Sequence, residues 1–220
     1  MDRQTFDKAL ALLRADYPKW EAPAKKSTYG YRRTPYTITI SVTLSFRTRD
    51  EVTQAAGERL FALADTPETM VTLTKEQIEK AIYPVGFYRK KAQTILDISH
   101  YLLEHCGGEV PNTEAELLKI KGIGPKAAAI ILERAFNQNV VAVDTHVHRI
   151  LNLWGFLDTK TPEESYEVLK RRLDDKDKEG LNRLLVAFGQ AVCRPQKPLC
   201  RRCPVKDLCK ISQNQTEDRQ

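Results

Sequence analysis

Residues 117–131 read LLKIKGIGPKAAAII, and the interpretation of the whole chain depends on this stretch. The pattern predicts an apolar helical segment that ends at Ile120, a tight KGIG turn, and a second helix that begins at Pro125, where a missing N–H costs nothing. Gly122 and Gly124 can adopt a positive φ and place no side chain in the turn. The first amides of the second helix should therefore face open space and, with the helix dipole, bind an anion such as a phosphate.

Lysines lie on both sides of this turn. Lys119, Lys121 and Lys126, together with the two apolar helices, favour a hairpin that binds the DNA backbone over a plain connector. Lys126 falls at about the second position of the new helix, where the dipole disfavours a cation. It is either a solvated lysine or an amine nucleophile suited to Schiff-base chemistry. The candidate DNA-binding residues of the turn are Lys121, Gly122, Ile123 and Gly124.

Size and composition limit the class of protein. The chain has 220 residues, enough for one large or two small domains, and 35 basic residues against 29 acidic ones give a formal net charge of +6. This excess favours an anionic partner such as nucleic acid. The first residues lead directly into an amphipathic pattern, and no apolar run reaches membrane-spanning length. We therefore expect a soluble cytoplasmic protein with no membrane partner.

Most of the chain shows helical periodicity with little strand signal. Residues 34–44 are β-branched and almost continuously apolar, so a helix and a buried strand both fit them. Asp50 has the position of a helix cap, and residues 174–180 should form a charged loop. The spacing predicts further helices over 5–17, from the Asp50 cap to about residue 61, and over 92–105, 125–136, 145–154, 161–173 and 181–192.

Four of the five cysteines lie close together near the C-terminal end, with the spacing C-x6-C-x2-C-x5-C. In a reducing compartment such a group is typical of metal binding rather than of disulfides. Four thiolates can hold zinc or an iron–sulfur cluster, and a single CxxC with long outer spacings favours the wider cluster. Arg201 and Arg202 would offset thiolate charge or contact DNA phosphates. The candidate metal ligands are Cys193, Cys200, Cys203 and Cys209.

A carboxylate, Asp144, follows the apolar run 140–143 and directly precedes a predicted helix. It could simply be the helix N-cap, which is a common reason for an aspartate at such a position. It also lies eighteen positions after Lys126. At the mouth of a cleft, a carboxylate could deprotonate an amine or stabilise a cationic sugar, and the two roles are compatible.

In this combination the motifs resemble endonuclease III, a family of the helix-hairpin-helix DNA glycosylase superfamily. The segments GIGPKAAA and VAVDTH and the cysteine spacing occur in the family's order and at matching separations. Upstream, TPYTITISVTLSFRTRD is similar to the family's pocket segment, and VGFYRKKA is similar to its second DNA-probing turn. The resemblance covers nearly the whole chain.

This resemblance implies an all-α fold of two domains, with a DNA cleft between them and a C-terminal [4Fe-4S] cluster loop. A six-helix domain that contains the helix-hairpin-helix would occupy residues 28–138. Residues 1–27 and 139–220 would form the iron–sulfur cluster domain, with the four cysteines as ligands. The partner would be damaged double-stranded DNA, and we expect a monomer associated with the nucleoid.

The resemblance also implies a bifunctional glycosylase and AP lyase of base excision repair that removes oxidised pyrimidines of the thymine glycol type. The damaged base is flipped out of the duplex. Lys126 then attacks C1′ of the sugar, the base leaves and a Schiff base forms, and β-elimination nicks the strand 3′ to the lesion. Asp144 would assist the lysine and stabilise positive charge on the sugar.

One position departs from the family's pattern. The glutamine that fills the space left by the flipped base is Arg47 here, which has five donors and no acceptor. It could pair with an orphaned purine, or contact a phosphate or Asp50 instead. Phe87, in the second probing turn, could insert between bases. The alternatives are a monofunctional mismatch or uracil DNA glycosylase and a non-catalytic cluster-bearing DNA-binding protein.

Overall fold

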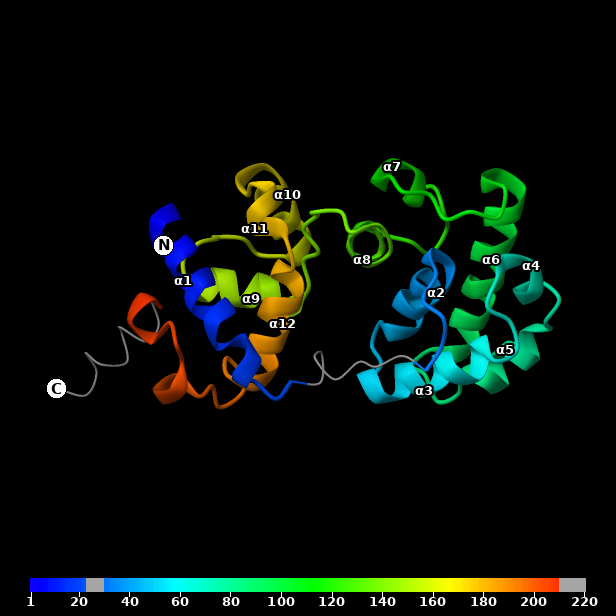
Figure 1. Ribbon diagram of the computed structural model, residues 1–220, viewed down its shortest axis with the longest axis horizontal. Helices are drawn as coiled ribbons and strands as arrows, with labels where there is room; N and C mark the ends of the chain where they lie inside the picture. Colours follow the sequence, from blue (N-terminus) through cyan, green and yellow to red (C-terminus); the bar gives the residue numbers. More distant parts are fainter. Residues whose placement is uncertain (23–29, 210–220) are drawn as a thin grey trace. The chain divides into compact units, whose positions relative to one another are not determined.

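The computed structural model describes residues 1–22 and 30–209, and every regular element in these ranges is a helix (Figure 1). The prediction of an all-α fold is therefore confirmed. The helices form two compact units: one holds the N-terminal helix and the chain from Val141 onward, and the other ends at Val140. A boundary at residue 28 falls outside the described residues. Among the described helices, none is long and apolar enough to cross a membrane.

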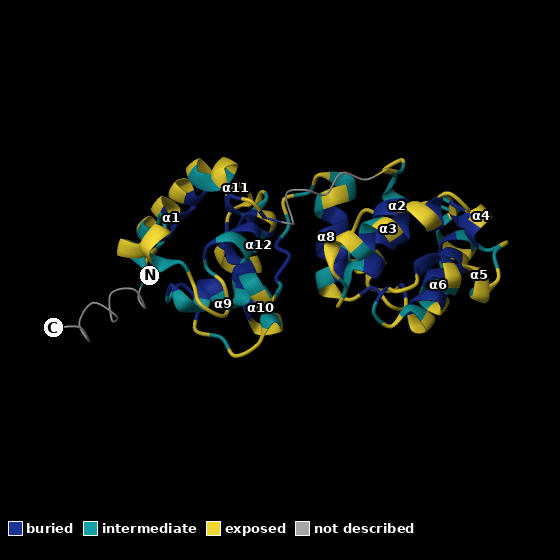
Figure 2. Cartoon of the chain, turned by 90° about the horizontal axis from the view of Figure 1, so that it is seen from below, coloured by how far each residue is buried: buried dark blue, intermediate teal, exposed yellow. Residues whose placement is uncertain are grey.

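The unit that ends at Val140 is organised around a buried helix, α2 (Pro35–Ser45), which contacts α3, α6 and α8. Nine of its eleven residues are buried, as the dark blue of Figure 2 shows. The other helices of this unit are α3 (Asp50–Phe61), α4 (Pro67–Met70), α5 (Lys75–Ile82), α6 (Tyr88–Cys106), α7 (Glu114–Leu117) and α8 (Pro125–Phe136).

Helix, not strand, is the conformation of residues 35–45. Thr34 and Thr37 form a capping box, and Pro35 follows at the first helical position. Inside the helix, buried hydroxyls donate to carbonyls four residues earlier, for example from Ser41 to Thr37 (2.6 Å) and from Thr43 to Thr39 (3.1 Å). The hydroxyls are thus satisfied without a neighbouring strand, and an almost uniformly apolar helix can lie in the core.

Two local predictions were wrong. Asp50 is the first residue of α3, and Arg49 is the N-cap residue, so the carboxylate adds charge near the helix dipole rather than capping the helix. Residues 174–180 do not form a simple loop, because Asp174 and Asp177 make a capping box that begins helix α11 (Asp175–Lys178).

The other unit is built on an aromatic core. The rings of Phe6 and Phe156 stack with centroids 3.9 Å apart, and Trp154 and Phe188 lie in the same cluster of buried residues. Its remaining elements are α1 (Arg3–Asp16), η1 (Tyr17–Lys19), α9 (Thr145–Leu153), α10 (Pro162–Arg172), α12 (Leu181–Ala191), η3 (Cys200–Arg202) and η4 (Lys206–Leu208).

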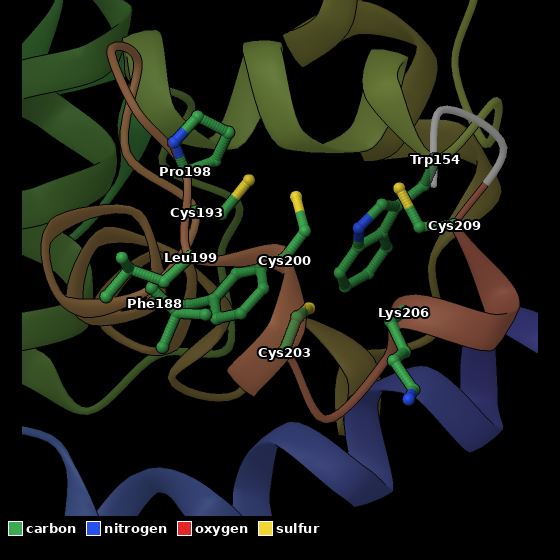
Figure 3. Close-up of a pocket in the computed structure, with 10 residues that line it drawn as sticks. Trp154, Phe188, Cys193, Pro198, Leu199, Cys200, Cys203, Lys206 and Cys209 are labelled. Carbon is green, nitrogen blue, oxygen red and sulfur yellow. The ribbon is translucent and has the colours of Figure 1, made fainter. Parts of the chain in front are cut away.

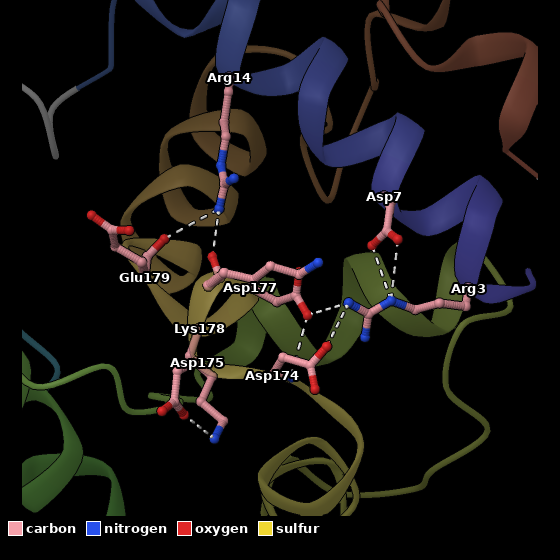
Figure 4. Close-up of polar contacts among 9 residues, drawn as sticks. Arg3, Asp7, Arg14, Asp174, Asp175, Asp177, Lys178 and Glu179 are labelled. Carbon is pink, nitrogen blue, oxygen red and sulfur yellow. Dashed lines mark hydrogen bonds and ion pairs between the residues drawn. The ribbon is translucent and has the colours of Figure 1, made fainter.

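Polar contacts fasten α1 to the C-terminal half of this unit (Figure 4). Arg3 pairs with Asp7 on its own helix and with Asp174 and the buried Asp177 of the α11 segment. Arg14 donates to backbone carbonyls of the same segment, including that of Lys176 (3.3 Å). Helix α1 and the α11 segment are therefore joined by charge-assisted bonds.

Candidate functional site

Backbone hydrogen bonds between residues three positions apart close the turn between α7 and α8. The amide of Ile120 donates to the carbonyl of Leu117 (3.1 Å), and the amide of Ile123 donates to the carbonyl of Ile120 (3.0 Å). All three side chains are buried and fix the turn to the core. The helix before the turn is only one turn long, because residues 118–120 leave the α-helical path. Lys121 stays exposed at the tip.

The two glycines of the turn differ in backbone conformation and in the space around them. Gly122 has a φ of +98°, and a Cβ there would lie 2.6 Å from Cγ2 of Thr94, so both the conformation and the approach of α6 require glycine. Gly124 has a φ of −95°, so it does not use the positive φ that glycine allows, and it is the N-cap residue of α8. A Cβ at Gly124 would meet no described atom within 4 Å. The N-terminus of α8 is therefore accessible to an anion.

Lys126 is the second residue of α8, directly after Pro125. Its Nζ lies 5.5 Å from the centroid of the Phe46 ring, the geometry of a cation–π contact. Phe46 is the C-cap residue of α2 and precedes Arg47. The structure thus brings the amine of the hairpin together with the segment that carries Arg47.

Arg47 and Phe87 also lie side by side, although forty residues separate them. The guanidinium carbon of Arg47 is 5.5 Å from the centroid of the Phe87 ring, and Phe87 is 61% exposed. Both residues have left-handed backbone conformations, with φ values of 54° and 58°. An exposed aromatic ring and an exposed guanidinium on two adjacent turns form a surface suited to contact with stacked bases.

Sequence reasoning missed a buried lysine beneath these two turns. Lys91 occurs in the segment VGFYRKKA, which resembles the family's second DNA-probing turn. In the structure its side chain points inward and is only 8% exposed. Its burial lowers the pKa of Lys91 to about 8. The signal that could have found it is helical spacing, because Lys91 and Ile95 lie four residues apart on the buried face of α6.

Asp144 is the N-cap residue of α9, as its position predicted. Its Oδ1 accepts hydrogen bonds from the amides of His146 and Val147, both 2.9 Å long. Both bonds end on Oδ1, so the cap uses one of the two carboxylate oxygens. Asp144 belongs to the unit that begins at Val141, whereas Lys126 belongs to the other unit.

The four clustered cysteines line one pocket of about 320 Å³ that is partly open to solvent (Figure 3). Cys193 follows α12, Cys200 begins η3, Cys203 directly follows η3, and Cys209 follows η4. Apart from Lys206, the other lining residues are apolar, namely Trp154, Phe188, Val192, Pro198 and Leu199. The loop therefore collects four thiols around a largely apolar space.

The thiols surround this space rather than one point. Within the described part of the chain, no three His, Cys, Asp or Glu side chains are gathered closely enough to hold a single metal ion. Burial raises the pKa of the Cys203 thiol to about 11 and also raises the pKa of Cys193. Arg149 donates to Sγ of Cys193 (3.6 Å) and to its carbonyl oxygen. Arg201 and Arg202 are exposed.

Comparison with known proteins identifies the family. The model of the HhH-GPD superfamily of base excision DNA repair proteins matches residues 40–174. Endonuclease III of Thermotoga maritima is 43% identical over 177 residues, which cover 80% of this chain and 83% of that protein. The chain belongs to the endonuclease III family.

In two relatives from an animal and a plant, the match covers only part of the relative's length. Mouse endonuclease III-like protein 1 is 36% identical, and the match covers 96% of this chain and 74% of that protein. The chloroplastic endonuclease III homolog 2 of Arabidopsis thaliana is 34% identical, and the match covers 94% of this chain and 58% of that protein.

Solved structures of endonuclease III have the same fold. A non-covalent endonuclease III–DNA complex matches with a TM-score of 0.87 and 27% identity, and 99% of each chain is covered. A trapped covalent endonuclease III–DNA intermediate matches equally well, with 27% identity and 98% of this chain covered. A thermostable thymine-DNA glycosylase, at 22% identity and a TM-score of 0.78, shares the fold.

Proposed function

We propose that this chain is a bifunctional DNA glycosylase and AP lyase of base excision repair, which removes oxidised pyrimidines of the thymine glycol type from duplex DNA. Membership of the endonuclease III family supports the enzyme class. The observation that carries the proposal is the position of Lys126 at the start of α8, between an accessible helix N-terminus and the segment with Arg47. A DNA phosphate bound by the turn would bring a nucleotide to this amine.

Lys126 acts as the nucleophile. Its unprotonated Nζ attacks C1′ of the flipped nucleotide, the N-glycosidic bond breaks, and the base leaves with the bonding electrons and a proton. Loss of the ring C–O bond opens the sugar and gives a protonated Schiff base at C1′. Removal of a proton from C2′ then breaks the bond between C3′ and the phosphate oxygen, which nicks the strand 3′ to the lesion.

Asp144 supports the same step as a general base and as a negative charge near the sugar. Its cap bonds occupy Oδ1 and hold the carboxylate in a fixed orientation. The assignment rests on the resemblance of VAVDTH to the family's motif and on this local geometry.

The remaining DNA contacts divide into two kinds. The turn residues Lys121, Gly122, Ile123 and Gly124 bind the backbone of the lesion strand at the hairpin tip, where Lys121 and both glycines are exposed, and Arg201 and Arg202 add phosphate contacts from the cluster loop. Arg47 fills the space of the flipped base and donates to the orphaned purine, while Phe87 inserts between bases. The substrate is damaged double-stranded DNA, and the protein acts as a monomer on nucleoid DNA in the cytoplasm.

The cysteine pocket fits a [4Fe-4S] cluster better than a zinc ion. Four thiols line one largely apolar pocket, and they are not gathered closely enough to hold a single ion. Cys193, Cys200, Cys203 and Cys209 would hold the cluster, and Arg149 would donate to one of its sulfur ligands. When bound, the cluster would supply the covalent framework that holds the basic loop in place.

Borohydride trapping tests the proposal directly. The enzyme is incubated with duplexes that carry thymine glycol, uracil or an abasic site, and borohydride reduces any Schiff base to a stable adduct. We expect covalent adducts with the thymine glycol and abasic duplexes and weak or no trapping with uracil. Base release without trapping on any duplex would indicate a monofunctional glycosylase, and binding without base release would indicate a non-catalytic DNA-binding protein.

A further inference from the structure

The two probing turns hold their side chains in strained backbone conformations. Arg47 and Phe87 both have φ values near 55–60°, in the left-handed region that residues with a Cβ seldom adopt. Such conformations persist only where the surrounding structure holds them. Contacts within the protein must therefore keep both turns in place before DNA is bound.

The ammonium group of Lys91 holds the first turn from below. It donates to the carbonyl of Leu44 (2.7 Å), to the carbonyl of Phe46 (2.6 Å) and to Oγ1 of Thr48 (3.2 Å). These three acceptors flank Arg47 in the sequence, since Leu44 and Phe46 precede it by three positions and one position and Thr48 follows it directly. Lysine has three N–H donors, and all three are used, which is the arrangement that makes a buried ammonium group tolerable.

The same network reaches the second turn. Oγ1 of Thr48 accepts a hydrogen bond from the amide of Gly86 (3.2 Å). A Cβ on Gly86 would lie 2.5 Å from the carbonyl oxygen of Arg47, so the two turns are in direct backbone contact. Gly86 is followed by Phe87, and Lys91 itself lies in the first turn of α6 directly after it. One buried lysine thus connects the turn that carries Arg47 to the turn that carries Phe87.

We propose that Lys91 is a positioning residue for lesion recognition, which locks the 46–48 turn against the 85–88 turn so that Arg47 and Phe87 enter the duplex as one preformed unit. This inference rests on the proposed function, because it assigns the purpose of the network to opening the duplex. A preformed unit lowers the entropy lost when the two side chains become ordered between bases. Lys91 touches neither the sugar nor the base; it acts through the two turns.

The first test compares Lys91→Met with Lys80→Met, which removes one lysine charge from an exposed position on α5. Single-turnover rates are measured for base release from a thymine glycol duplex and for cleavage of a preformed abasic site. We expect Lys91→Met to slow base release by about 10- to 100-fold, the effect of a displaced positioning group. Cleavage of the abasic site should change by less than about threefold, since its base is already absent. Lys80→Met should match the wild type on both substrates.

A fluorescent base opposite the lesion reports whether the enzyme unstacks the duplex at that position. 2-Aminopurine becomes brighter when it is unstacked, and we expect this increase on binding to the wild type and its loss in Lys91→Met. Equal losses on the lesion and abasic substrates, or an unchanged fluorescence increase, would overturn the proposal, because a purely structural lysine would lower both activities together.

A second variant tests the same contact between the turns without replacing Lys91. Its result therefore does not depend on whether Lys91→Met folds correctly. Gly86→Ala keeps Lys91 and adds one methyl group 2.5 Å from the carbonyl of Arg47, which forces the turns apart. It should show the same selective loss of base release. Wild-type base release by Gly86→Ala would overturn the proposal. Borohydride trapping on the abasic duplex, which depends on Lys126, stays intact in both variants if only positioning fails; its absence from the wild type would instead refute the proposed function.

Discussion

The two units position their candidate functional groups by different means. In the unit that ends at Val140, protein atoms alone hold the site: Gly122 lets the hairpin approach α6, and Lys91 fixes the turn around Arg47. In the unit that begins at Val141, Asp144 is held by an ordinary helix cap, but the four cysteines surround a space of about 320 Å³. The difference indicates that the first region is preformed by protein contacts, whereas the cluster proposed for the cysteine loop would add covalent bonds to that loop.

The largest expected effect tests the preformed region. We expect Lys126→Gln to lower strand cleavage and borohydride trapping by at least about 10³-fold, because glutamine cannot form a Schiff base. Melting temperature and duplex affinity should stay close to wild type, since Lys126 is half-buried and the helix start is already fixed by Pro125. Trapping of the variant at the wild-type level would remove Lys126 from the catalytic role.

The cysteine loop should respond in the opposite way, with loss of structure. We expect the protein as purified to be brown and to contain about four irons per chain, the stoichiometry of a [4Fe-4S] cluster. Cys203→Ser should lose iron and melt at a lower temperature, because the apolar pocket beside Trp154 and Phe188 would then lack its contents. Metal analysis and calorimetry measure both. About one zinc per chain in a colourless protein would contradict the cluster.

A pair of substitutions at Asp144 separates chemistry from capping. Asparagine caps a helix about as well as aspartate, so Asp144→Asn should slow base release by about 10²-fold or more while stability changes little. Asp144→Ala should be equally slow and lose about 1 kcal/mol of unfolding free energy, because the bonds to His146 and Val147 disappear. Normal base release by Asp144→Asn would reduce Asp144 to a cap.

Sequence patterns predicted those features of the structure, such as helix bounds, that depend on residues close together in the chain. Helix α8 has its bounds at 125 and 136 as expected, because Pro125 and the apolar spacing define it. For residues 35–45 the sequence allowed either a helix or a buried strand. An almost uniformly apolar run shows neither the helical nor the strand periodicity, so it does not distinguish a core helix from a core strand. The left-handed turns at Arg47 and Phe87 were not predictable, since they depend on Lys91, which lies more than forty positions from the first of them.

The pH dependence of stability measures how tightly Lys91 is held. Its pKa falls from 10.5 to about 8 on folding because of burial, so the unfolded chain binds more protons between these values. The unfolding free energy should therefore rise with pH from about 8 to about 10.5, and the cost of burying the charge is fully present below pH 8. Relative to Lys91→Met, the wild type should gain up to about 3 kcal/mol across this window. A constant difference in denaturant titrations would mean that the three hydrogen bonds offset burial.

The smallest expected effect concerns Arg47, where the chain departs from its family's pattern. If the enzyme flips a damaged pyrimidine, the opposite base loses its partner and its stack, and a side chain must fill the space. The guanidinium of Arg47 lies 5.5 Å from the Phe87 ring centroid, where it can stack on bases and donate two parallel hydrogen bonds. Guanine presents the best matching acceptors, O6 and N7.

We therefore expect Arg47→Ala to slow base release from an intact duplex by about tenfold, which corresponds to one lost bidentate contact of about 1–3 kcal/mol. The loss should be largest opposite guanine, and cleavage of a preformed abasic site should change little. Single-turnover rates on four duplexes that differ only in the opposite base measure this dependence, with Arg47→Gln as the conservative control. A uniform loss over all four bases, relieved at low salt, would instead make Arg47 a phosphate contact. In that case Phe87 alone would occupy the space left by the flipped base. Lys91 would then position the ring that inserts between bases, and not a side chain that hydrogen-bonds to the opposite base.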